Sequence, residues 1–195
     1  MKDPNCVLTR HVARIVRQAL ERGTTVEIDG LGTFLPGRNR GFRFIAQARP
    51  RVFIAYVEED LKAADKLYQA LERRGFRPWL DKKNLMPGQS WPRAIETAIH
   101  TSEFFVACFS HRSTSKRGNF HSELRYALAC AEKVPLDETF FIPLRLDDCI
   151  VPRPVARRIQ YLDMFPDWNT GVDKVVEVMK HQERNRLRKK LPLAG

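Results

Sequence analysis

The residues that most often carry enzyme chemistry occur in this chain without the spacings that the common reactions require. No P-loop motif G-x-x-x-x-G-K-[ST] is present, and Gly30-Leu31-Gly32 lacks the third glycine of a dinucleotide fingerprint. His121 and Glu123 do not form a zinc motif, and no serine occupies a G-x-S-x-G nucleophile elbow. We therefore expect no resident metal or cofactor, and any chemistry must depend on polar side chains that the fold brings together.

The elements that would position such side chains alternate between strands and helices across the middle of the chain. Short apolar runs predict the strands, and apolar residues at helical spacing predict helices of about 10–15 residues between them. The predicted strands are 52–56, 76–80, 104–109, 140–144 and 159–162, and the predicted helices are 60–74, one starting near Pro92, 120–133, and one starting near Val172. This alternation indicates an α/β fold with a parallel sheet covered by helices on both faces.

The positions of the strands indicate where a ligand would bind. Pro78 predicts an edge position for strand 76–80, whereas the wholly apolar segment 104–109 predicts a central strand. Ligands of parallel α/β folds bind beyond the carboxyl ends of the strands. The loops that follow Tyr56, Leu80 and Phe109 are thus the segments in which functional residues are expected.

Composition and charge narrow the class of protein further. The chain has 195 residues, 43% of them hydrophobic, and a net charge of +11. Most of this charge lies at the ends, because residues 1–50 carry +5, residues 51–179 carry +1 and residues 180–195 carry +5. No apolar run is long enough to span a membrane, and the first residues lack the apolar region of a secretory signal. The scattered cysteines predict free thiols at Cys108 and Cys130, and we expect a cytoplasmic protein that does not bind membranes.

A set of motifs in the middle of the chain resembles the TIR domain. These motifs occur in the family's order and spacing within residues 51–180: Phe53-Ile54-Ala55-Tyr56, Asp60, Trp79-Leu80-Asp81, Leu85-x-Pro87-Gly88-x-x-Trp91, Ile95, Ser110 and Ser122-Glu123-Leu124. The resemblance implies a flavodoxin-like fold with five parallel strands and helices on both faces. It also implies that segment 81–91 is the BB loop, which in this family contributes to assembly contacts and to the active site.

The resemblance implies that Glu123 is a catalytic residue. TIR domains are either scaffolds or enzymes that cleave the nicotinamide–ribose bond of NAD⁺, and the enzymes carry a glutamate at the start of the helix after the third strand, where Glu123 stands. The alternative is that Glu123 only complements the helix dipole. Three positions depart from the family pattern: Ala55 replaces a serine, Val57 replaces an arginine, and Asn119 replaces an aromatic residue.

A single carboxylate is chemically sufficient for this reaction. Ordinary glycosidases use a second carboxyl group to protonate a poor leaving group. The nicotinamide of NAD⁺ is already a pyridinium cation and leaves as a neutral molecule, so NAD⁺ as the substrate requires no acid. Glu123 would hold the ribose hydroxyls and stabilise the cationic transition state. Its side chain lies off the apolar stripe of its helix, so we expect an exposed site where Gln costs under about 0.5 kcal/mol of stability.

Other residues on the same loops are candidates for binding the dinucleotide. They are Tyr56, Asp81, Trp91, Ser110, Ser115, Arg117, Asn119 and Phe120. Surface roles for the loop residues, and core packing for Phe120 and Trp91, are the alternatives that the sequence leaves open. Lys82 and Lys83 either meet the pyrophosphate or remain solvated in their loop.

The first fifty residues differ from the rest and form a separate small module. An amphipathic helix that ends at Gly23 precedes a predicted β-hairpin over 25–35. The stretch Thr25 to Phe34 resembles the helix-to-hairpin region of HU/IHF-type nucleoid proteins, and Arg38-Asn39-Arg40 is similar to the basic segment that follows. The long DNA-binding arm and the first helix of that fold are missing. We therefore favour a dimerisation or docking module over a DNA-binding one.

These observations predict an NAD⁺ hydrolase that is activated by self-association. The expected organisation is a module at 1–50, a TIR domain at 51–180 and a basic tail at 181–195. Homo-oligomers or filaments would form through segment 81–91 and the first module, with weak nucleic-acid contact through the basic ends. Antiphage defence is the role that the resemblance implies. A non-enzymatic TIR scaffold and a DNA-binding protein that oligomerises through its TIR domain are the alternatives.

Overall fold

The computed structural model describes residues 4–28, 31–37, 41–46, 49–115, 119–135 and 138–190. The chain divides into two compact units, Met1–Arg49 and Pro50–Gly195. Each unit has its own sheet, and each is described here by itself.

The larger unit is built on a five-stranded parallel sheet, as the sequence predicts. Its strands are β4 (Arg51–Ala55), β5 (Arg77–Trp79), β6 (Phe104–Phe109), β7 (Phe141–Arg145) and β8 (Leu162–Asp163). They lie in the order β5-β4-β6-β7-β8, and each neighbouring pair is parallel. The central strand β6 is buried along its whole length, whereas β5, which contains Pro78, lies at the edge. Both positions confirm the predictions from residue type.

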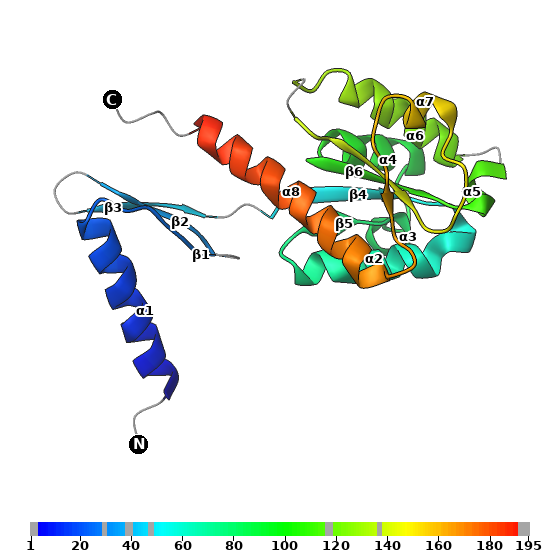
Figure 1. Ribbon diagram of the computed structural model, residues 1–195. Coiled ribbons are helices and arrows are strands. Elements are labelled where there is room, and N and C mark those ends of the chain that lie inside the picture. Colours follow the sequence, from blue (N-terminus) through cyan, green and yellow to red (C-terminus); the bar gives the residue numbers. More distant parts are fainter. Residues whose placement is uncertain are drawn as a thin grey trace. The chain divides into compact units, whose positions relative to one another are not determined.

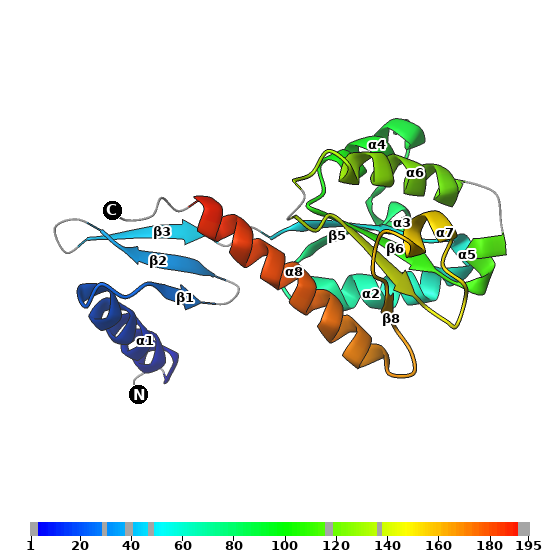
Figure 2. The same cartoon turned by 45° about the horizontal axis from the view of Figure 1, so that its top comes forward.

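Helices cover both faces of this sheet (Figures 1 and 2). They are η2 (Glu58–Asp60), α2 (Leu61–Arg73), α3 (Asp81–Asn84), α4 (Trp91–His100), α5 (His111–Ser115), α6 (Asn119–Ala131), α7 (Arg153–Ala156) and α8 (Trp168–Lys190). Apolar residues of α2 and α8 pack in one core cluster, and those of α4, α6 and α7 pack in a second cluster. Consecutive residues of a strand point to opposite faces, so the buried strands contribute to both clusters.

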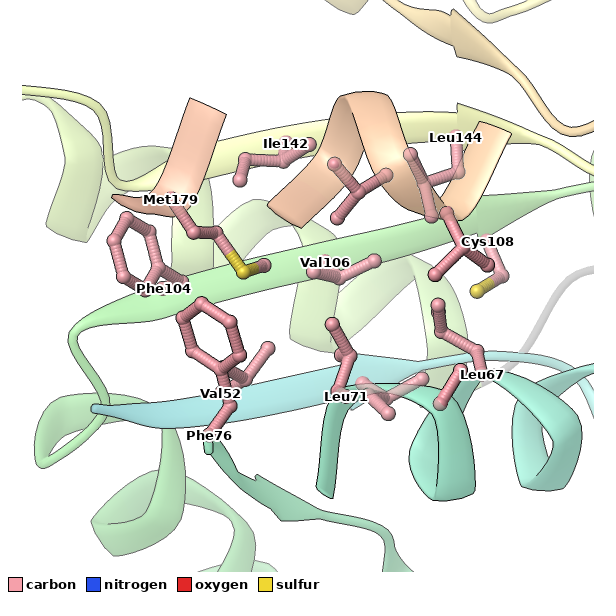
Figure 3. Packing of buried hydrophobic residues seen from close by; sticks show 14 of the residues in the cluster. Val52, Leu67, Leu71, Phe76, Phe104, Val106, Cys108, Ile142, Leu144 and Met179 are labelled. Carbon is pink, nitrogen blue, oxygen red and sulfur yellow. The ribbon is translucent and has the colours of Figure 1, made fainter. Parts of the chain in front are cut away.

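The two core clusters differ in chemistry. Aliphatic residues dominate the face under α2 and α8, where Leu67, Leu71 and Met179 pack over Val106 (Figure 3). On the other face four aromatic rings stack across neighbouring strands, with centroid separations of 4.9 Å for Phe53 and Trp79, 5.3 Å for Phe53 and Phe105, and 5.3 Å for Phe105 and Phe141. Both clusters anchor the strands whose carboxyl ends carry the candidate site.

The smaller unit has one more strand than the sequence analysis predicts. Helix α1 (Pro4–Glu21) precedes β1 (Val26–Ile28), β2 (Gly32–Pro36) and β3 (Phe42–Ala46), which form an antiparallel sheet in the order β1-β2-β3. The predicted hairpin corresponds to β1 and β2, and β3 adds to the free edge of β2. Gly32 is required here, because it has φ +147° and a Cβ atom would lie 2.3 Å from the carbonyl oxygen of Ile45.

Several predicted boundaries are shifted. The polar stretch 81–90 is not entirely loop, because α3 occupies its first residues. The fifth strand is Leu162–Asp163 instead of 159–162, and the helix predicted at 120–133 spans Asn119–Ala131. Within the residues that the structure describes, no helix is both long enough and apolar enough to cross a membrane.

Candidate active site

Three polar side chains gather beyond the carboxyl ends of neighbouring strands. Tyr56 directly follows β4, Asp81 opens the short helix α3 after β5, and Glu123 belongs to α6, which follows β6. The Tyr56 hydroxyl donates a hydrogen bond of 2.6 Å to Oδ1 of Asp81, which also accepts one of 2.7 Å from the backbone N–H of Lys82. The parallel arrangement of β5, β4 and β6 brings together residues that are up to 67 positions apart in the sequence.

Glu123 differs from its predicted setting in two ways. Because α6 begins at Asn119, Glu123 is its fifth residue and lies just beyond the first turn, where the helix dipole has little effect. The side chain is also partly buried, which corrects the expectation of an exposed site.

The electrostatic environment of Glu123 disfavours its ionised form. Burial and, as the smaller cause, the negative charge of Asp81 together raise the pKa of Glu123 to about 7. Burial is the largest cause of the raised pKa of Tyr56. Its hydrogen bond to Asp81 and the charges of Asp81, Glu58 and Glu123 raise the pKa in the same direction. Tyr56 therefore remains a hydrogen-bond donor at physiological pH, and the three groups form one electrostatically coupled site.

Ser110 lies at the end of β6 but is occupied within a buried network. Its hydroxyl donates a hydrogen bond to Oδ2 of Asp60, and its backbone N–H donates one of 2.8 Å to the hydroxyl of Ser113. Nη1 of Arg112 lies 3.6 Å from the other Asp60 oxygen. Because Ser110 is only 2% exposed, it supports the loop after β6 from within. The structure does not bring its side chain into an open site.

The remaining predicted site residues are placed less directly. Trp91 is the first residue of α4 and is 39% exposed, and it belongs to neither core cluster, so its interpretation as a core anchor is wrong. The backbones of Ser115, Asn119 and Phe120 lie at the end of α5 and the start of α6, but their side chains are not described. Arg117 lies outside the described residues.

Both lysines of α3 are engaged by carboxylates on or next to α2. Nζ of Lys82 lies 3.1 Å from Glu58, and Nζ of Lys83 lies 2.7 Å from Asp65 and above the ring of Tyr68. The structure thus shows ion pairs for these side chains in place of a free phosphate-binding pair.

Sequence analysis missed one cluster of possible metal ligands. His111, Asp147 and Asp148 have ligand atoms within 4.8 Å of one another. Nδ1 of His111 lies 3.1 Å from Asp147, which also accepts hydrogen bonds from the backbone N–H groups of His111 and Cys149. His111 and Asp147 are 36 positions apart in the sequence, so no local motif indicates this cluster. The contacts join the loops that follow β6 and β7.

A parallel sheet of order β5-β4-β6-β7-β8, with its polar site beyond the carboxyl ends of the strands, places this protein among the flavodoxin-like α/β proteins. The chain belongs to the TIR domain family, whose profile matches residues 52–176. The resemblance recognised in the sequence is thereby confirmed. The match ends within α8 and does not include the smaller unit.

Individual relatives are distant. Over 116 residues the chain is 25% identical to the uncharacterized protein y4cD of Sinorhizobium fredii, an alignment that covers 60% of this chain and 18% of that protein. Among solved structures, it is similar to a metazoan TIR-STING receptor from C. gigas in complex with 2′,3′-cGAMP, with 18% identity and a TM-score of 0.54 over 69% of this chain and 41% of that one. The TIR domain of the Toll-related receptor TRR-2 from Hydra magnipapillata is 24% identical, with a TM-score of 0.49 over 71% of this chain and 95% of that one. At these identities the structural likeness concerns the fold alone.

Proposed function

We propose that this protein is an NAD⁺ glycohydrolase whose essential group is the carboxylate of Glu123. The observation that carries the proposal is the position of Glu123, which is partly buried and electrostatically coupled to Asp81 beyond the carboxyl edge of the sheet. Enzymatic members of the TIR family cleave NAD⁺ with a glutamate at this point of the fold. The resemblance and the geometry thus support the same residue.

A purely structural role accounts poorly for this arrangement. Burial and the nearby Asp81 both oppose the charge of Glu123, so the carboxylate reduces the stability of the folded protein at neutral pH. Its position beyond the first turn also leaves little benefit from the helix dipole. Side chains kept in unfavourable electrostatic surroundings at a candidate ligand site are characteristic of functional sites.

The proposed reaction breaks the bond between the anomeric carbon of the ribose and the pyridinium nitrogen. The bonding electrons pass to that nitrogen, so nicotinamide leaves as a neutral molecule and the ribose acquires cationic character. Glu123 in its ionised form stabilises this cation and accepts hydrogen bonds from the ribose hydroxyls. Water then adds to the anomeric carbon and releases a proton, which gives ADP-ribose. Attack by another nucleophile would give a cyclic or transferred ADP-ribosyl product.

Asp81 and Tyr56 have supporting roles in this proposal. The Tyr56 hydroxyl holds Asp81 through the 2.6 Å hydrogen bond, and Asp81 adds negative potential where the cationic substrate and transition state would lie. Binding of the pyridinium cation opposes the influence of Asp81 on Glu123 and favours the ionised form of Glu123. The negative charges of Glu123 and Asp81 would thus have a stronger effect in the substrate complex than in the free protein.

Self-association completes the proposal. Segment 81–91 contains α3 and the turn at Gly88, whose φ is +86°, and it includes the 65% exposed Met86 and the partly exposed Trp91. Exposed apolar side chains next to a candidate site are suited to contact with another copy. NAD⁺ depletion in antiphage defence is the biological role that we propose on the family resemblance.

The proposal is tested by measuring NAD⁺ consumption with purified protein and separating the products by chromatography. We expect the wild-type chain to release nicotinamide and Glu123→Gln to be slower by about a hundred- to a thousand-fold, because one preorganised electrostatic group is lost. Glu96→Gln is the matched control, since Glu96 lies on α4 with an exposed side chain. The control should keep the wild-type rate. Near wild-type turnover in Glu123→Gln would contradict the assignment and favour a scaffold.

A further inference from the structure

The buried carboxylate of Asp60 has no direct part in the proposed chemistry. Asp60 ends η2 and immediately precedes α2, but its side chain forms no capping hydrogen bond with that helix, which is the usual role of an aspartate at this position. The residue is only 7% exposed, and a buried charge is costly unless other groups pair with it. We therefore expect Asp60 to serve a segment other than its own helix.

The partners of Asp60 lie on the loop that follows β6. Its Oδ2 accepts a hydrogen bond from the hydroxyl of Ser110, and its Oδ1 lies 3.6 Å from Nη1 of Arg112. The same nitrogen donates a hydrogen bond of 3.0 Å to the backbone carbonyl of Glu59. Burial and, as the smaller cause, the charge of Asp60 raise the pKa of the Cys108 thiol on β6 to about 12. Asp60 thus ties the loop after β4 to the loop after β6.

The loop that Asp60 holds is itself fixed by reciprocal hydrogen bonds. The backbone N–H of Ser110 donates a hydrogen bond of 2.8 Å to the hydroxyl of Ser113, and the N–H of Ser113 donates one of 3.1 Å to the hydroxyl of Ser110. The Ser113 hydroxyl, which is fully buried, donates another of 3.0 Å to the carbonyl of Ser110. A displacement of Ser110 would therefore move the start of α5 with it.

The two loops carry different parts of the candidate active site. Tyr56, which holds Asp81, is four residues before Asp60, whereas Glu123 belongs to α6, the helix that follows the loop of Ser110. The pairing of β4 with β6 ends before either loop begins, so strand pairing does not by itself set the separation of the loops. The contact between Asp60 and Ser110 lies where that separation is decided.

We propose that Asp60 is a positioning residue, which sets the distance between Tyr56 and Glu123. Its hydrogen bond with Ser110 holds the two loops together, and an error of about 1 Å in such a distance can cost about a hundredfold in rate. This inference rests on the proposed NAD⁺ hydrolysis, because the distance matters only if both groups act on one substrate. The alternative is that the contact only stabilises the fold, and that core packing of α6 alone places Glu123.

The first test measures kcat and KM for NAD⁺ in two nearly isosteric variants of the full chain. Ser110→Ala removes the hydroxyl donor and should lower kcat about ten- to a hundredfold with a smaller change in KM. Asp60→Asn keeps an acceptor for Ser110 and should retain more activity than Ser110→Ala. Glu59→Gln is the matched control, since it removes an exposed carboxylate from η2 but leaves the backbone carbonyl that Arg112 contacts. The control should keep the wild-type kcat, and a folded Ser110→Ala variant that also keeps it would overturn the proposal.

The second test does not depend on turnover. Carbon-13 NMR of glutamate-labelled protein follows the titration of Glu123, whose signal is identified by its loss in Glu123→Gln. In Ser110→Ala the pKa of Glu123 should fall by at least about half a pH unit, because a loosened loop admits water and separates Glu123 from Asp81. Asp60→Asn should give an intermediate value, and circular dichroism checks the fold of both variants.

The two tests together separate this inference from the proposed function. An unchanged pKa of Glu123 in folded variants that are merely less stable would show that the contact is structural only, and would overturn the positioning role. A lowered pKa in variants of a chain that consumes no NAD⁺ would support the role of Asp60 in placing Glu123 and would contradict the proposed hydrolysis alone.

Discussion

At the scale of single residues, the partial burial of Glu123 lowers the stability of the folded protein at neutral pH, an effect that the sequence did not indicate. Its pKa is raised from an ordinary value of 4.5 to about 7, first by burial and then by Asp81. A carboxyl group with a raised pKa binds its proton more tightly in the folded state than in the unfolded state. The contribution of Glu123 to the free energy of unfolding is therefore most favourable below pH 4.5. It is lost as the pH rises from 4.5 through 7.

Glu123→Gln should make the protein more stable at alkaline pH. Glutamine does not ionise, so the variant avoids the cost of a buried charge, and its gain over the wild type should grow between about pH 4.5 and 8. The gain corresponds to at most about 3 kcal/mol. Urea unfolding at pH 5 and pH 8 measures it, with Glu96→Gln as the control. A gain that does not depend on pH would contradict the electrostatic account of this residue.

The same pKa predicts how activity responds to pH. The proposed chemistry needs ionised Glu123, so kcat/KM for NAD⁺ should rise with pH through a midpoint near 7, which reports the free protein. A steady-state profile from pH 5 to 9 provides the measurement. The midpoint should fall when Asp81 is replaced by Asn, because one of the two causes of the shift is removed. A profile that is flat across this range would disagree with a role for the ionised glutamate.

At the scale of elements, glycines set the ends of helices that lead into the sheet. Helix α2 ends at Arg73, and Gly75 follows with φ +88°, so that the chain turns into β5. The N–H of Phe76 bonds the carbonyl of Leu71 at 3.1 Å, which closes the last turn. A Cβ atom at Gly75 would have nothing within 4 Å, so a larger residue here meets only backbone strain.

Gly75→Ala should lower the free energy of unfolding by about 1–2 kcal/mol, because an L-residue disfavours the left-handed conformation. Gly75→Asn is the matched comparison, since asparagine tolerates that conformation better and should cost less than alanine. Urea denaturation with an unchanged m-value would measure both. An alanine variant as stable as the wild type would mean that α2 can end without the left-handed residue.

At the scale of the whole molecule, the larger unit carries the candidate active site, whereas the described side chains of the smaller unit form almost no buried core. Residues 50–190 bury one substantial cluster on each face of a five-stranded sheet, whereas among residues 11–28, 31–37 and 41–46 of the smaller unit only Gly32 is buried. This contrast predicts that the smaller unit works as an assembly element. Pairing there would raise the local concentration of the TIR units and promote their own contacts through segment 81–91.

Specific activity should therefore increase with protein concentration, and not remain constant as for an independent enzyme. Assembly through the smaller unit predicts that removal of residues 1–49 abolishes this increase while the larger unit retains its fold. NAD⁺ consumption measured over a hundredfold range of protein concentration tests the dependence, and circular dichroism of the truncated chain checks the fold. A truncated protein with full specific activity at every concentration would count against the assembly model.

The sequence by itself determined those features that depend on local pattern. Alternating apolar runs and amphipathic stretches predicted the parallel α/β sheet, Pro78 predicted an edge strand, and the wholly apolar segment 104–109 predicted the central one. These predictions succeeded because backbone hydrogen bonding and burial impose periodicities that neighbouring residues must satisfy. Strand β3 was missed, since the basic segment before it concealed the alternation of Phe42, Arg43 and Phe44.

Only the tertiary structure decided which of the candidate side chains meet. The sequence made Tyr56, Asp81 and Ser110 equal candidates for substrate binding. In the fold Tyr56 donates a hydrogen bond to Asp81 near Glu123, whereas Ser110 donates one to Asp60, 50 positions away. It likewise pairs both lysines of α3 with carboxylates and places Glu123 in partly buried surroundings. These outcomes depend on which strands are neighbours and on how much water each loop excludes. Both are properties of packing between distant segments, for which the local sequence carries no periodic signal.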